Sequence, residues 1–271
     1  MLAIGACSVV IHALLFQDLY GRYSGFYLNP NAAGFICLSG YCLSFYLKQE
    51  RIKYFALALF SFAGFLTFSR YFILIWLVVT LVSVFIKRKN LIVFGIGVSS
   101  IIVLISLSAI LQLNTERYAA IDEILNNQFD KGLTIFMTDS RQENWSEYYD
   151  QILDHPFFGT GYQKLMGYDG RKQGVHNAYL LTIGEAGLIP FLILIFIFFR
   201  LFKTGFLRIS EVPHYFLMTV AISSYFLTSH NFYDYFPGLF ILLLIYIKLH
   251  EEHVELEKSD ADSLIITPSK T

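Results

Sequence analysis

The sequence predicts an all-α fold: a polytopic transmembrane helical bundle that carries one helical domain outside the membrane. Three observations lead to this fold class. The 271 residues are 55% hydrophobic and only 15% charged, a balance that is not typical of soluble domains. Apolar runs recur along the chain and resemble membrane-spanning segments. One long polar stretch, residues 112–177, interrupts them.

The apolar runs predict about eight spans. Several runs are shorter than the roughly 20 residues that cross a bilayer comfortably, so their ends must recruit flanking aromatic and polar residues. The first run lacks the basic leader of a secretory signal and is therefore interpreted as a span. The runs cover residues 1–16, 32–47, 54–68, 71–86, 91–111, 178–199, 214–229 and 238–249.

These spans divide the chain into four regions. Residues 1–111 hold about five N-terminal spans, residues 112–177 form the polar block, and residues 178–249 hold about three C-terminal spans. Residues 250–271 are rich in Glu and Asp, which predicts a solvated, disordered tail. With a net charge of −1 and no basic stripe apart from the membrane-flanking clusters, we expect no nucleic-acid partner.

Basic residues orient the predicted spans. They cluster in three connections, and the positive-inside rule places these connections in the cytoplasm. Both termini are then cytoplasmic, and the polar block lies on the outer side. As a consequence, Arg22, Arg70, Arg141 and His176, which come from separate parts of the sequence, all face outward. The three clusters are Lys48, Arg51 and Lys53; Lys87, Arg88 and Lys89; and Arg200, Lys203 and Arg208.

A short amphipathic helix is predicted near the start of the polar block. Tyr118, Ile121 and Leu125 recur at helical spacing, and Asn114-Thr115 before them can cap a helix. We therefore expect a helix over about residues 115–128.

A second helix in the polar block is signalled more strongly. Ser140-Arg141-Gln142-Glu143 fits a capping box, and Trp145, Tyr148 and Ile152 follow on one face, so a helix is expected over about residues 141–153. Arg141 then lies in its first turn, where exposed N–H groups attract anions and the guanidinium adds a bidentate donor for phosphate oxygens. A solvated surface arginine is the alternative interpretation.

His176-Asn177 stands at the outer mouth of the next span and is a candidate for chemistry. An imidazole that titrates near neutral pH can take a proton from a hydroxyl group. The turn Gly159-Thr160-Gly161 before it gives the backbone freedom to approach the bilayer closely. A hydrogen-bonding anchor at the interface is the alternative role of this histidine.

Two further polar features have open interpretations. Glu185 lies within an apolar run, where an acid is costly unless it is paired or faces a cavity. It either orients a catalytic side chain or structures a kink at Gly187 and Pro190. The cluster His230-Asn231 with Tyr233, Asp234 and Tyr235 is either an interfacial aromatic belt or part of a sugar-binding lip.

Several motifs occur in an order that resembles the O-antigen ligase and polymerase superfamily. The resemblance covers roughly residues 17–245 and rests on the ordered set of motifs. In chain order they are Asn29-Pro30-Asn31, Ser69-Arg70, Ser140-Arg141 with Trp145, His155-Pro156-x-x-Gly159-x-Gly161, His176-Asn177-x-Tyr179-Leu180 and Glu185-x-Gly187.

This resemblance implies a GT-C-like enzyme of the bacterial inner membrane. Such an enzyme takes a glycan from an undecaprenyl-diphosphate carrier and joins it to an acceptor hydroxyl in the periplasm. The acceptor is a sugar of lipid A core or of another lipid-linked glycan. The resemblance implies neither a metal nor another cofactor, and attack opposite the leaving diphosphate would invert the anomeric centre.

The resemblance also implies roles for individual residues. The family's outer-loop arginine is similar to Arg141 and its essential histidine to His176, which implies diphosphate stabilisation by Arg141 and general-base catalysis by His176. Fixed guanidinium groups would stabilise the charge that develops as the glycosidic bond breaks. Further substrate contacts are expected from Arg22, Arg70, Arg171 and Lys172, with Asn177 and Glu185 in support.

Three alternatives stay open. A ligase, a polymerase and a related protein glycosyltransferase differ in acceptor, and the sequence does not separate them. A transporter or export component for lipid-linked polysaccharide is the alternative function, although ionisable groups gather at one face rather than near mid-membrane. Family members usually carry more spans ahead of Asn29-Pro30-Asn31, so a shortened, inactive member is also an alternative.

Overall fold

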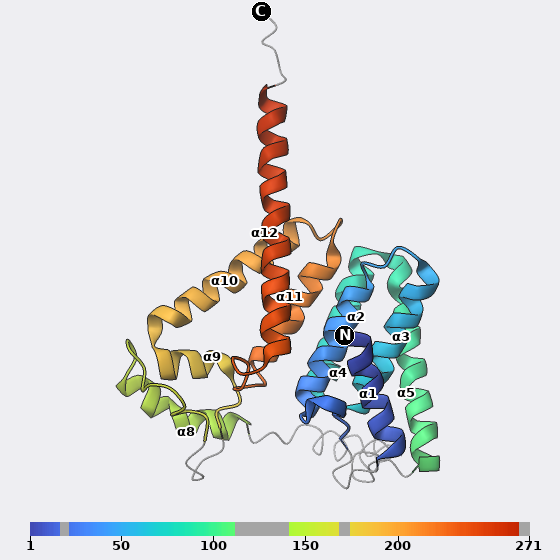
Figure 1. Ribbon diagram of the computed structural model, residues 1–271, viewed down its shortest axis with the longest axis horizontal. Coiled ribbons are helices and arrows are strands. Elements are labelled where there is room, and N and C mark those ends of the chain that lie inside the picture. The colour runs from blue at the N-terminus through green and yellow to red at the C-terminus, as the bar shows by residue number, and fades with distance from the viewer. Residues whose placement is uncertain (17–21, 112–140, 168–173, 266–271) are drawn as a thin grey trace, which may run out of the picture.

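The computed structural model describes residues 1–16, 22–111, 141–167 and 174–265 (Figure 1). Within these ranges the chain is all-helical, as predicted, and contains no strand. The N-terminal half consists of α1 (Leu2–Leu15), α2 (Pro30–Ser44), α3 (Glu50–Leu66), α4 (Arg70–Ile86) and α5 (Leu91–Leu111). The C-terminal half consists of α8 (Arg141–Asp154), α9 (Ala178–Leu181), the π-helical turn η3 (Thr182–Ala186), α10 (Leu188–Leu207), α11 (Pro213–Phe226) and α12 (Phe236–Ile265).

The predicted apolar runs lie on helices, apart from a break in the run over residues 178–199. Among the described helices, two are long and apolar enough to cross a membrane. By length and composition, Arg88–Ser106 and Leu188–Leu207 can cross a membrane, and Leu2–Leu15 and Arg70–Ile86 are apolar but shorter. The total of eight spans stays a prediction.

The run predicted over residues 178–199 is not one helix. It breaks into α9, η3 and α10, and Gly187 at the break has a φ of 87°. An L side chain rarely adopts such a φ, so glycine permits the sharp change of direction before α10 begins at Leu188. The predicted kink therefore occurs, and it separates α9 and η3 from α10.

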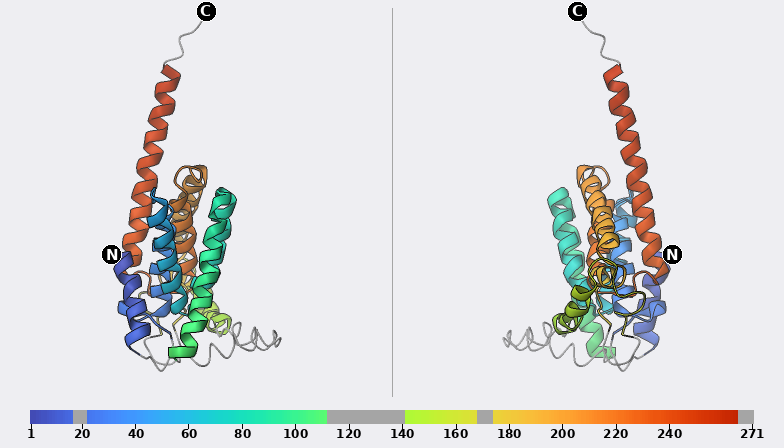
Figure 2. Two further views of the ribbon diagram at one scale, coloured as in Figure 1. Left: turned by 90° about the vertical axis from the view of Figure 1, so that its right-hand side faces the viewer. Right: turned by 90° about the vertical axis from the view of Figure 1, so that its left-hand side faces the viewer.

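The helices alternate in direction, so the candidate site residues gather at one end of the bundle. Figures 1 and 2 place the first residues of α2 and α4, the helix α8 and the connection between α11 and α12 at the lower end. The connections between α2 and α3, α4 and α5, and α10 and α11 lie toward the opposite end, and these connections and the adjoining helix ends carry the three basic clusters. This arrangement agrees with the alternation on which the predicted topology depends.

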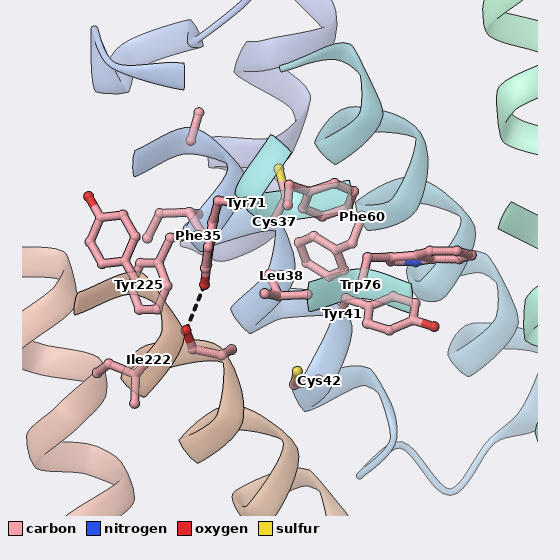
Figure 3. Packing of buried hydrophobic residues seen from close by; sticks show 14 of the residues in the cluster. Phe35, Cys37, Leu38, Tyr41, Cys42, Phe60, Tyr71, Trp76, Ile222 and Tyr225 are labelled. Carbon is pink, nitrogen blue, oxygen red and sulfur yellow. Dashed lines mark hydrogen bonds between the residues drawn. The ribbon is translucent and has the colours of Figure 1, made fainter. Parts of the chain in front are cut away.

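Helix α2 forms the centre of the core and joins the two halves of the chain. Phe35 of α2 stacks on Tyr225 of α11 with ring centroids 4.5 Å apart, and the Tyr71 hydroxyl of α4 donates to the Ala221 carbonyl at 2.6 Å (Figure 3). Polar contacts between apolar helices add to this packing, such as the 3.0 Å bond from Trp76 Nε1 to the Ser61 hydroxyl. These contacts fix the relative positions of the helices that carry the site.

Candidate active site

Three helices open with the same kind of turn. In each, a non-glycine residue in the left-handed region precedes an Asn or Ser whose side chain accepts a backbone N–H. Such a backbone is costly for a non-glycine residue and is typical of functional sites. The pairs are Leu28-Asn29 before α2, Phe68-Ser69 before α4 and His176-Asn177 before α9.

Asn177 caps α9 directly beside His176. Its Oδ1 accepts the backbone N–H of Tyr179 at 3.0 Å and that of Leu180 at 3.2 Å. Asn177 is also buried, and the φ of His176 is 47°. The cap therefore holds the backbone that presents His176, which gives Asn177 a defined positioning role.

The openings of α2 and α4 meet through Asn31. Its Oδ1 accepts a hydrogen bond from the Ser69 hydroxyl at 2.8 Å and one from the Arg22 guanidinium at 3.4 Å. Arg70 follows Ser69 as the first residue of α4. The structure thus brings Arg22 and Arg70, predicted from separate parts of the sequence, to two neighbouring helix N-termini, where the helix dipole favours anions.

Glu185 binds the backbone of the segment that leads to His176. Its two carboxylate oxygens accept the N–H groups of Gln163 at 3.0 Å and Leu165 at 2.8 Å. The Leu165 carbonyl in turn accepts the N–H of Val175 at 3.0 Å, one residue before His176. Glu185 therefore satisfies its charge with backbone donors and organises this segment.

Two glycines allow the turn after α8 to lie against the break before α10. A Cβ on Gly159 would lie 2.3 Å from the Glu185 carbonyl oxygen, and one on Gly187 would lie 2.1 Å from the Phe157 carbonyl oxygen. At this contact Thr160 donates its N–H to the Gly184 carbonyl at 2.8 Å. Only a residue without a side chain permits this approach.

Helix α8 completes a small second core under this segment. Tyr148 and Ile152 are buried against Leu165, Val175 and other apolar side chains, and Trp145 packs beside them. The predicted face of the helix is therefore confirmed. This core includes both Leu165 and Val175, whose backbones are hydrogen bonded to each other. It therefore fixes the position of the chain just before His176.

The imidazole of His176 contacts that of His230. Their Nδ1 atoms are 3.0 Å apart, and the rings meet edge to face with centroids 4.4 Å apart. Burial lowers the pKa of His230 to about 4, with a smaller contribution from the charge of His176. His230 therefore stays neutral near pH 7.

An apolar groove lies next to this segment, on the side of α10. It has a volume of about 510 Å³, and Glu185 and Tyr162 are among the few polar groups at its edge. The Tyr233 hydroxyl and the Thr182 hydroxyl, which also line it, are 2.5 Å apart. The remaining lining residues are Met166, Leu181, Ala186, Pro190, Ile193, Leu194 and Ile197.

A family model described as O-antigen ligase matches residues 55–195, more than half of the chain. The chain belongs to the O-antigen ligase family. This result confirms the resemblance seen in the motifs, and it identifies a membrane protein of glycan transfer and polysaccharide biosynthesis, with lipid-linked glycan and acceptor as its substrates in general. Neither a curated protein nor a solved structure matches the chain.

The residues that match the O-antigen ligase family include much of the site but not all of it. Arg70, His176, Asn177 and Glu185 lie inside the matched range, whereas Arg22 and His230 lie outside it. The range ends within α10. His230 therefore joins the site from a part of the chain that the family match does not cover.

Three predicted site residues are not placed by the structure. Arg141 begins α8, as predicted, but its side chain lies outside the described part of the chain. Arg171 and Lys172 lie outside the described residues, and so does the helix predicted over residues 115–128. The roles of these residues and the helix over 115–128 stay predictions from the sequence.

Sequence reasoning missed the pairing of His230 with His176. The two residues are 54 positions apart, and His230 was interpreted only as part of an aromatic belt or a sugar-binding lip. One signal was present: the dipeptide His-Asn occurs twice, at 176–177 and 230–231, each time next to a predicted span on the outer side.

The loop that follows His230 lies near the first turns of α2 and α4. The ring of Tyr235, five positions after His230, has its centroid 6.2 Å from that of Tyr225. The Tyr225 ring in turn lies 4.5 Å from that of Phe35 in α2 and 5.6 Å from that of Tyr71, the residue after Arg70. The histidine pair and the helix openings with Arg22 and Arg70 therefore border the same region of this family member.

Proposed function

We propose that this O-antigen ligase family member is an inverting membrane glycosyltransferase. It transfers a glycan from an undecaprenyl-diphosphate carrier to an acceptor hydroxyl on the periplasmic face. The observation that carries the proposal is the placement of His176. Its backbone is held in the left-handed region beside the Asn177 cap of α9, and its ring contacts His230 of the α11–α12 connection, at the end of the bundle where α2 and α4 begin.

His176 acts as the general base. It takes the proton of the acceptor hydroxyl as the oxygen attacks the anomeric carbon, a step to which base catalysis commonly contributes about 10²- to 10⁴-fold. The carbon–oxygen bond to the diphosphate breaks on the opposite face, and its electron pair goes to the leaving phosphate oxygen. The anomeric centre is inverted.

Arginines stabilise the leaving diphosphate. Arg22 and Arg70 lie at the N-termini of α2 and α4, which are linked through Asn31, so guanidinium groups and helix dipoles act on the same region. Arg141 in the first turn of α8, with Arg171 and Lys172, adds positive charge to the same step. A preorganised donor of this kind is worth about 10²- to 10³-fold in rate.

The apolar groove beside η3 suits the carrier chain. Its wall is aliphatic apart from the few polar groups at its edge, and it runs along the first turns of α10. A prenyl chain in this groove would place its diphosphate at the end of the bundle that holds the histidines. The groove therefore supports a lipid-linked donor.

The topology proposed with this function follows from the basic clusters. The chain crosses the inner membrane about eight times as a GT-C-like bundle, with both termini in the cytoplasm and residues 112–177 in the periplasm. The large apolar side chains exposed on the helices, among them Phe85, Ile189 and Phe196, support contact with lipid.

Transfer by the purified protein tests this function. Wild-type protein in lipid nanodiscs, supplied with a carrier-linked glycan and candidate acceptors, is expected to release undecaprenyl diphosphate and extend one acceptor class. Lipid A core, a second carrier-linked glycan and a protein serve as the three acceptors. Movement of the intact carrier-linked glycan across a vesicle membrane without transfer would instead support a transporter and contradict the proposal.

A further inference from the structure

The contact between His176 and His230 constrains where their protons sit. Their Nδ1 atoms are 3.0 Å apart. A hydrogen bond at this distance requires that one Nδ1 carries a proton and that the other presents its lone pair. The tautomers of the two rings are therefore coupled, and fixing one ring fixes the other.

The role of His176 as a base selects one of the two arrangements. Its Nδ1 is engaged with His230, so a proton that His176 takes from a hydroxyl group goes to Nε2. Nε2 has a lone pair only when the ring proton is on Nδ1. We propose that His230 is a positioning residue that accepts this Nδ1–H and thereby holds His176 in the tautomer whose Nε2 is basic. The proposal rests on the proposed function of His176.

The surroundings of His230 suit an acceptor. Burial, with a smaller contribution from His176, lowers the pKa of His230 to about 4, so its ring is neutral and can present a lone pair. Gly174 lies against the same ring, because a Cβ there would lie 2.7 Å from Cε1 of His230. The ring is thus enclosed between His176 and the segment of Gly174.

The pair acts in the transfer step without a second proton movement. The hydroxyl proton moves to Nε2 of His176, which becomes an imidazolium. Its Nδ1–H bond to the neutral His230 then becomes charge-assisted and stronger. His230 itself takes no proton. Its contribution resembles that of the group that orients the histidine in other base-catalysed enzymes.

Substitutions that differ only in where they place a polar group test the proposal. An Asn side chain reaches the place of Nδ1, whereas a Gln side chain reaches the place of Nε2. His230→Ala and His230→Gln are expected to lower kcat by about 10- to 100-fold with little change in KM, as for other residues that orient a reacting group. His230→Asn is expected to keep most of the wild-type kcat.

Two outcomes would overturn the role of His230. One is a stably inserted His230→Ala protein with wild-type kcat. The other is a His230→Asn protein as impaired as His230→Ala, because an acceptor at the place of Nδ1 would then be insufficient. A His176→Ala protein that keeps full activity would instead contradict the base itself.

Nitrogen NMR of histidine-labelled protein in nanodiscs provides a readout without substrate. The expected wild-type spectrum has the proton on Nδ1 of His176, and His230→Asn is expected to keep it there. His230→Ala is expected to give a mixture of tautomers. A wild-type His176 with its proton on Nε2 would contradict the proposal whatever the activity of the variants.

Discussion

Glu185 accepts the backbone N–H of Leu165 at 2.8 Å, and the carbonyl of Leu165 accepts the N–H of Val175 at 3.0 Å. One acidic side chain in the helix break thereby holds the segment that ends at His176. Placing an acid inside an apolar run carries a desolvation free energy. Two hydrogen bonds from backbone N–H groups to the Glu185 carboxylate offset part of it.

Replacing Glu185 should misplace His176. We expect Glu185→Ala to lower transfer activity by about 10- to 100-fold, because a residue that orients a reacting group typically contributes this much. Glu185→Gln should have an intermediate effect, since an amide offers one acceptor oxygen in place of two. Activity normalised to the amount of inserted protein measures the effect, and an unchanged Glu185→Ala activity would contradict the positioning role.

The glycines of the turn provide a matched pair of substitutions. Gly159 and Gly161 both have a positive φ, of 68° and 93°, but a Cβ at Gly159 meets the Glu185 carbonyl oxygen at 2.3 Å whereas one at Gly161 meets nothing within 4 Å. Gly161→Ala should cost only the backbone strain, about 1 kcal/mol of stability. Gly159→Ala should cost more and reduce activity. Thermal unfolding and transfer assays measure both; equal effects would refute the close packing at Gly159.

Asn31 should matter more than the neighbouring cap residue Asn29. Asn31→Ala removes the acceptor shared by Ser69 and Arg22, so we expect weaker binding of a diphosphate-containing donor and about a 10-fold loss of kcat/KM, the scale of one charge-assisted hydrogen bond. Asn29→Ala removes a helix cap worth about 1 kcal/mol and serves as the control. Donor titrations in nanodiscs separate the two, and equal kcat/KM values would count against a role of Asn31 in placing Arg22.

His230 should make stability depend on pH. Its pKa falls from 6.5 to about 4 in the folded protein, so the unfolded chain binds more protons between these values. Stability should therefore decrease as pH falls from about 6.5 toward about 4, and His230→Asn should weaken this dependence. Thermal unfolding in nanodiscs across this range provides the measurement. A His230→Asn protein with the wild-type slope would show that other groups account for it.

The sequence predicted the local features of the site well. The helix over residues 141–153 and its apolar face agree with α8, because the spacing of Trp145, Tyr148 and Ile152 is a short-range signal. The place of Asn177 at the start of a helix follows from the same kind of signal, an N-cap before an apolar run.

Contacts between distant segments were not predictable in the same way. The pairing of His176 with His230 and the bonds of Glu185 to Gln163 and Leu165 depend on how helices pack, and nothing in the spacing of residues encodes that packing. The split of the run 178–199 had a local signal at Gly187, but the backbone donors that Glu185 receives there come from another segment.

The most direct test of the proposed mechanism is transfer by purified wild-type and His176→Ala protein, inserted in nanodiscs to equal levels and given the same carrier-linked donor and acceptor. A general base at His176 predicts that the substitution lowers kcat by about 10²- to 10⁴-fold while donor binding is retained. Wild-type kcat in a stably inserted His176→Ala protein would contradict the mechanism.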